Sequence, residues 1–169
     1  MEDADIFLSI AEIAGVFVGF GALISFSPDR AVEARAPLRT VVTIGLVVLV
    51  AALLPVALAR YGLTDRALWG WSSGGFLFVI WLAILVPLLD TEQRTWMKAD
   101  AKANPALTMF LLAFLELPIQ VPLALVVLGV VTTLASAFYV TALVLNLFEA
   151  ALVLARLVFA RSEPADWGS

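Results

Sequence analysis

Residues 6–26 read IFLSIAEIAGVFVGFGALISF and contain a single charged side chain, Glu12. At about 1.5 Å per residue, a helix over this run crosses the roughly 30 Å hydrocarbon core of a bilayer. The residues before it, MEDAD, are acidic, whereas a cleavable signal peptide starts with positive charge. We therefore expect an uncleaved membrane-spanning helix in this part of the chain.

Four more apolar runs follow, and each is long enough to cross a bilayer as a helix. Their side chains lack the alternation of membrane-barrel strands, and helices are the other fold that satisfies its backbone groups in lipid. We predict an all-α integral membrane protein with one domain over residues 1–169, formed by a single bundle of five transmembrane helices. A bundle of four, in which the fourth run does not cross, is the alternative. The five predicted spans cover residues 6–26, 38–59, 67–89, 107–131 and 137–160.

The composition favours a membrane protein and excludes several kinds of chemistry. Of the 169 residues, 63% are hydrophobic and 14% are charged, against about 45–50% and 25% in soluble domains. A chain this short cannot bury so much apolar surface in one core. It has no cysteine and no histidine, which excludes thiolate metal sites, histidine-bound haem or zinc, and a Ser-His-Asp triad. We therefore expect no cofactor and no metal.

The same composition bears on location and partners. It resembles that of small bacterial inner-membrane proteins, and we expect the chain to be integral to such a membrane, with the lipid bilayer around it. No basic tract indicates a nucleic-acid partner. We also expect contacts with further membrane chains, as a homo-oligomer or within a larger membrane complex.

The basic residues predict an orientation. Loops on the cytoplasmic side carry an excess of lysine and arginine, and only Arg60 and Arg66 fall on the other side of the predicted bundle. The N-terminus is then outside and the C-terminus inside. We expect Tyr61, Trp69, Trp71 and Tyr139 to line the outer interface and Trp96 the inner one. The basic residues on the predicted inner side are Arg30, Arg35, Arg39, Arg94, Lys98, Lys102, Arg156 and Arg161.

The longest polar stretch, DTEQRTWMKADAKANP over residues 90–105, lies on this inner side. It is either a helix in the membrane interface, with Trp96 and Met97 as anchors, or a solvated loop with mixed charges.

Small residues in two of the spans predict helix packing. Gly15 and Gly19 are four residues apart, which lets two helix backbones approach closely. Glu12 belongs to the same helix face, so we expect it to be shielded from lipid. Gly70 and Gly74 form a second pair of this kind, and the G-x-S-x-G pattern that they complete needs a histidine base that the chain lacks.

The fourth run contains the stretch LELPIQVP over residues 115–122. Pro118 and Pro122 have no N–H to donate, so each should leave the carbonyl four residues earlier free and break or kink the helix. Glu116 and Gln120 share a face beside this break. Broken helices with free carbonyls and a carboxylate bind cations in many transporters. The alternative is a packing kink in which Glu116 pairs with a neighbour such as Arg156.

The fifth run carries its polar side chains on one face. Steps of three and four residues place them on the same side of a helix, and the other sides are apolar. We expect this face to turn toward protein or water. It either lines an ion pathway or joins neighbouring helices through hydrogen bonds. The face is formed by Tyr139, Ala142, Asn146, Glu149, Val153 and Arg156.

These patterns predict a small homo-oligomeric channel or transporter that passes cations or protons. Carboxyls deep in a membrane are costly, and without matching deep cations they favour cation selectivity. Five spans give little wall for a pore, so the pathway should form between subunits. Glu12 would gate the route or relay protons, and Arg156 would form its inner mouth. The remaining residues of the predicted pathway are Glu116, Gln120, Asn146 and Glu149.

A non-catalytic subunit or assembly partner of a larger membrane complex is the alternative function, with the glycine faces and carboxyls as docking surfaces. An enzyme is least supported, because no nucleophile–base pair or cofactor motif is present. We therefore predict that the chain is not an enzyme.

Overall fold

The computed structural model describes residues 4–25 and 31–159, which form helices joined by short connections. Arg30 and Arg161, assigned above to the inner side, lie outside these residues. The helices are α1 (Ala4–Ser25), α2 (Ala31–Arg60), α3 (Asp65–Leu89), α4 (Thr91–Ala103), α5 (Pro105–Leu111), the π-helical segment η2 (Leu112–Glu116), α6 (Leu117–Val127) and α7 (Ala135–Phe159).

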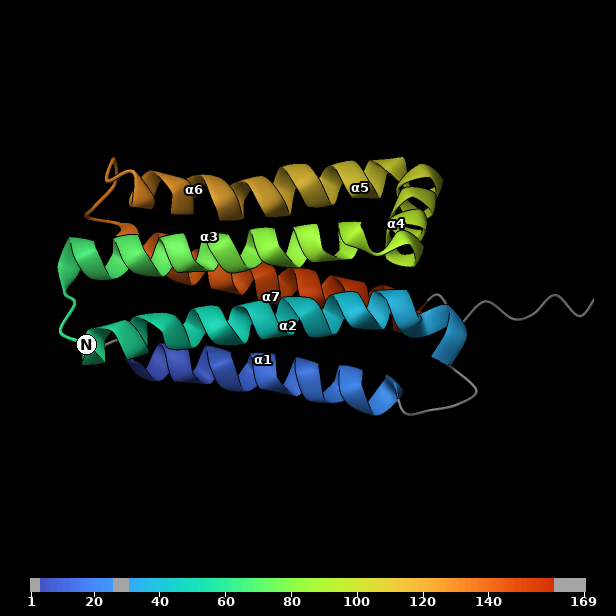
Figure 1. The fold of residues 1–169 in the computed structure, drawn as a ribbon, viewed down its shortest axis with the longest axis horizontal. Coiled ribbons are helices and arrows are strands. Elements are labelled where there is room, and N and C mark those ends of the chain that lie inside the picture. The colour runs from blue at the N-terminus through green and yellow to red at the C-terminus, as the bar shows by residue number, and fades with distance from the viewer. Residues whose placement is uncertain (1–3, 26–30, 160–169) are drawn as a thin grey trace, which may run out of the picture.

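The long helices form one bundle, in which consecutive spans run in opposite directions (Figure 1). α2 lies near its middle and packs against α1, α3 and α7, while α6 packs against α3 and α7. α1 contacts mainly α2 and therefore forms one edge of the bundle. α4 crosses one end of the bundle and joins α3 to α5 (Figure 1). The polar stretch predicted as either a helix or a loop is thus mostly helical.

Five helical stretches are long and apolar enough to cross a membrane: Ala4–Ile24, Pro37–Arg60, Asp65–Leu89, Thr108–Val127 and Ala135–Arg156. Large apolar side chains cover the outside of the bundle, with Phe78 68% exposed and Phe114 65% exposed. A soluble monomer does not expose apolar surface on this scale, whereas lipid solvates it. The protein is an all-helical integral membrane protein.

Two glycines end the helices at the predicted outer side. Gly62 follows α2 with a φ of 84°, and Gly129 follows α6 with a φ of 71°. At both ends the glycine N–H and the next N–H donate to carbonyls of the last turn, as from Gly129 to Val126 and from Val130 to Leu125. This is the Schellman arrangement, which favours glycine because of its positive φ. The fourth span therefore ends before Gly129 rather than at residue 131.

A buried aromatic cluster holds together the half of the bundle that is predicted to face outward. The Tyr139 ring on α7 packs against Phe7, Trp69 and Phe76 from α1 and α3, with ring centroids 5.5–6.1 Å apart. Its hydroxyl donates to the Ala51 carbonyl at 2.7 Å. Our expectation that Tyr139 lines the outer interface is wrong, because its side chain is fully buried.

A proline explains why the Ala51 carbonyl needs this partner. Pro55 lies inside α2, four residues after Ala51. Because proline has no N–H, it cannot make the helical hydrogen bond to that carbonyl. The Tyr139 hydroxyl replaces the missing donor, so the hydrogen bond links α7 to α2 at a defined height in the bundle.

The helices α1 and α2 are in tight contact at Gly21 and Gly45. A Cβ on Gly45 would lie 2.9 Å from Val18 Cγ2 and 3.3 Å from the Ala14 carbonyl oxygen. A Cβ on Gly21 would meet the Val42 side chain. These two positions, rather than Gly15 and Gly19, provide the close contact between helices within one chain.

Replacing Gly45 with leucine should lower the free energy of unfolding by about 1–3 kcal/mol, because the new side chain overpacks the α1–α2 contact. The matched control is Gly70→Leu, since a Cβ on Gly70 meets nothing within 4 Å. Unfolding of the purified protein followed by tryptophan fluorescence measures both. Equal stability of the two variants would contradict the close α1–α2 contact.

Candidate functional site

A π-helical segment lies directly before the two prolines of the fourth span. It covers Leu112–Glu116, and α6 then continues through both Pro118 and Pro122. A proline ring clashes with the carbonyl four residues earlier, which for Pro118 belongs to Phe114. Widening the turn to a π-helix relieves this clash, and such turns are frequent at functional sites. The chain therefore stays helical here and changes its hydrogen-bond pattern.

Glu116 is the last residue of this π-helical segment, and Gln120 follows one turn later in α6. The Gln120 Nε2 donates to the Glu116 Oε2 at 2.6 Å, in a partly buried position. The prediction that these two side chains share a helix face is confirmed. The hydrogen bond holds the Glu116 carboxyl in one orientation beside the π turn.

Glu149 on α7 lies close enough to Glu116 for the two carboxyls to interact electrostatically. Both are only partly exposed. Glu116 lies about 12 Å along its helix from Thr108, and Glu149 about 10 Å from Arg156, by the helical rise. Thr108 begins the fourth span and Arg156 ends the fifth, and these two span ends lie at the same side of the bundle. The two acids therefore lie at similar depth, inside the predicted spans rather than at their ends.

The polar face predicted for α7 points into the bundle. Ala142 and Asn146 are buried, whereas Val144 and Phe148 on the opposite side are each 49% exposed. The Asn146 Nδ2 donates to the Ala142 carbonyl of its own helix at 3.2 Å. Arg156 is exposed in the last turn of α7. The inward orientation is confirmed, and the role of this face in an ion pathway stays a prediction.

Glu12 does not join the other two acids. Its side chain is exposed on α1, so the described part of this chain does not shield it from lipid, and shielding by another chain stays a prediction. The reason is the position of α1 at the edge of the bundle, where mainly one neighbour covers it. On the same helix, a Cβ on Gly19 meets nothing within 4 Å, and one on Gly15 meets only Leu49, at 3.9 Å. The open space beside Gly19 leaves room for a helix of another chain to pack there.

The second predicted glycine pair lies in α3. A Cβ on Gly70 meets nothing within 4 Å, and one on Gly74 touches Val127 of α6 at 3.9 Å. Between them, the Ser72 and Ser73 hydroxyls are fully buried and have no hydrogen-bond partner among the residues that the structure describes. Their small side chains allow α3 to pack closely in the bundle.

Comparisons with family models, curated proteins and solved structures found no match, so the site is interpreted from its own chemistry. The carboxyl and amide groups of the site offer oxygen ligands for a cation, and the carboxyls can also take up and release protons. The sequence patterns indicated each acid separately, but helix periodicity contains no information on which helices become neighbours. The pairing of Glu116 with Glu149 was therefore visible only in the folded chain.

Proposed function

We propose that the protein passes protons or small cations across the membrane, and that the Glu116–Glu149 carboxyl pair binds them on the way. The observation that carries this proposal is that two acids from neighbouring helices lie within electrostatic range of each other at similar depth in the bundle. Two ionised carboxylates at close range repel each other, and a proton or cation between them relieves the repulsion.

The cost of the pair argues for a functional role. Each ionisable group placed deep in a bilayer costs roughly 2.5–3.5 kcal/mol on insertion scales. Two neutral amides would link α6 to α7 through hydrogen bonds at lower cost. Gln120 already supplies such an amide on the same face and bonds Glu116. A purely structural contact therefore does not need the second acid.

In this proposal the protein acts as a homo-oligomer. In one chain the Glu12 carboxyl is exposed at the edge of the bundle, where lipid is an unfavourable neighbour for a charge. A second copy placed on this face of α1 would cover Glu12 and use the open space at Gly19. Subunit contacts would also provide the wall that five helices alone do not.

Ion flux into liposomes that contain only the purified protein tests the proposal. We expect proton or cation flux and no comparable chloride flux. Glu116→Gln removes the charged carboxylate that would bind the ion, and an interaction with a charged group contributes roughly 1.5–3 kcal/mol. The flux through this variant should therefore be lower by about tenfold or more. Asp65→Asn is the matched control, since Asp65 is an exposed acid at the first residue of α3, away from the carboxyl pair. Absence of flux from the folded protein would contradict the proposal.

The exposed face of α1 also favours the second candidate function, a non-catalytic subunit of a larger membrane complex. In that case a different membrane chain covers Glu12, and the purified protein conducts nothing. Crosslinking in native membranes from a photoreactive group at residue 16, next to this face, distinguishes the two. A crosslink to a second copy supports the homo-oligomer, and a crosslink to another protein supports the subunit.

A further inference from the structure

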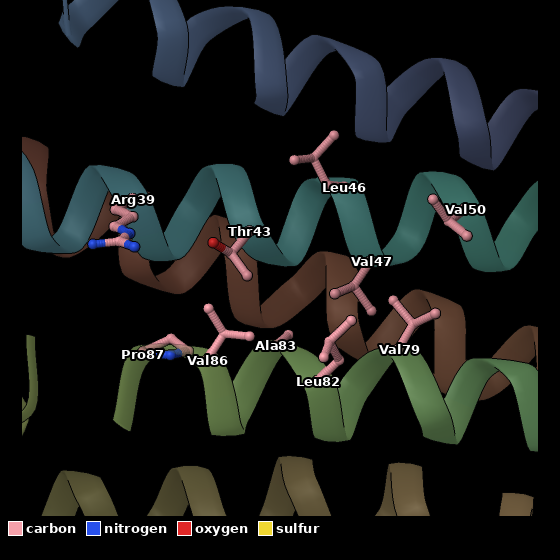
Figure 2. Close-up of a pocket in the computed structure, with 10 residues that line it drawn as sticks. All are labelled: Arg39, Thr43, Leu46, Val47, Val50, Val79, Leu82, Ala83, Val86 and Pro87. Carbon is pink, nitrogen blue, oxygen red and sulfur yellow. The ribbon is translucent and has the colours of Figure 1, made fainter. Parts of the chain in front are cut away.

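A narrow groove opens between α2 and α3, away from the carboxyl pair. Its volume is about 250 Å³, and its walls are mostly aliphatic side chains such as Val50, Val79 and Ala83. Figure 2 shows Val47 and Val79 pointing into the space between the two helices, with Arg39 and Thr43 at one end. The groove is therefore apolar along its length and polar at a single end.

The groove has the length of one bilayer leaflet. Arg39 and Val50 mark its two ends on α2, and eleven residues of helix correspond to about 16 Å. Half of a hydrocarbon core of roughly 30 Å is about 15 Å. Arg39 lies two residues inside the start of the Pro37–Arg60 span. The polar end thus lies at the membrane interface, and the apolar end lies near the midplane.

The polar end can bind an anion. Among the described residues, the Arg39 side chain is 52% exposed and donates a hydrogen bond, 2.8 Å long, to the Asp90 carboxylate. A guanidinium has five N–H donors in a fork, so one arginine can bind a carboxylate and a phosphate together. The Thr43 hydroxyl lies one turn further along the same wall of the groove (Figure 2).

We propose that the groove binds one acyl chain of a phospholipid whose phosphate contacts Arg39 and Thr43. A transmembrane helix has a diameter of about 10–12 Å with its side chains, so it could lie over a groove of about 250 Å³ but could not enter it. A phospholipid matches the length, the apolar wall and the charge at once, and the proposal does not depend on the transport function.

Native mass spectrometry of the purified protein with added dioleoyl phosphatidylglycerol tests this site. We expect one lipid to stay bound and Arg39→Gln to lower the bound fraction about fivefold or more, because an arginine at an anionic lipid surface contributes about 1 kcal/mol. Arg60→Gln is the matched control, since Arg60 is the exposed arginine at the other end of α2, and it should change binding less than about twofold.

Two further pairs separate lipid binding from loss of the fold. Ala83→Phe fills the groove and should displace the lipid, whereas Leu85→Phe lies outside it and should not. Asp90→Asn breaks the ion pair but keeps Arg39, so binding should persist. An equal loss in Asp90→Asn and Arg39→Gln would assign the effect to the α2–α3 ion pair and overturn the proposal. Equal binding of a dioleoylglycerol without phosphate would overturn it as well.

Discussion

Glu149→Gln should lower cation or proton flux about tenfold or more, and adding Glu116→Gln to it should lower the flux little further. Two carboxyls that act as one binding site lose their function when either one is removed. Their effects are then strongly non-additive, as is common for side chains that interact directly. Glu116 at the end of the π turn and Glu149 on α7 lie within electrostatic range of each other.

Flux into liposomes from the two single variants and the double variant measures this coupling. Glutamine keeps the size of the side chain, so each variant should fold, and helicity together with unfolding temperature verifies this. Glu12→Gln is the informative comparison, because Glu12 is exposed on α1 and does not belong to the carboxyl pair. Independent effects of the two single variants, which multiply in the double variant, would show that the acids do not act as one site.

The sequence alone was sufficient for the class of fold and for which side chains share one face of a helix. The apolar runs predicted five spans, and the spacing on the last helix predicted that Asn146 points inward. Both inferences rest on local periodicity, which a helix keeps regardless of its surroundings. Gln120 and Glu116 belong to the same category, since four residues separate them on one helix.

Contacts between helices could not be predicted in this way. Gly15, Gly19 and Gly45 all lack a side chain, but only the packing of α1 on α2 decides that Gly45 marks the close contact. Tyr139 looks like an interfacial aromatic by its position near a helix end. The aromatic cluster buries it instead, because the helices around it provide both an apolar site and a hydrogen-bond acceptor.

The buried ring and the hydrogen bond of Tyr139 should both contribute to the stability of the bundle. Tyr139→Ala should lower the free energy of unfolding by about 3–5 kcal/mol, the usual cost of removing a buried aromatic ring and leaving a cavity. Tyr139→Phe keeps the ring but leaves the buried Ala51 carbonyl without its donor, so it should cost about 1–3 kcal/mol. Denaturation in mixed detergent, followed by tryptophan fluorescence, measures both values.

Pro55 provides the control that isolates the hydrogen bond. In Pro55→Ala the new N–H at residue 55 can donate to the Ala51 carbonyl within α2, as in an ordinary helix. The Tyr139 hydroxyl then becomes redundant, and Tyr139→Phe should cost clearly less in the Pro55→Ala background than in the natural chain. The same cost in both backgrounds would mean that the hydroxyl does not compensate for the proline. The difference between the two costs measures how strongly Pro55 on α2 and Tyr139 on α7 depend on each other.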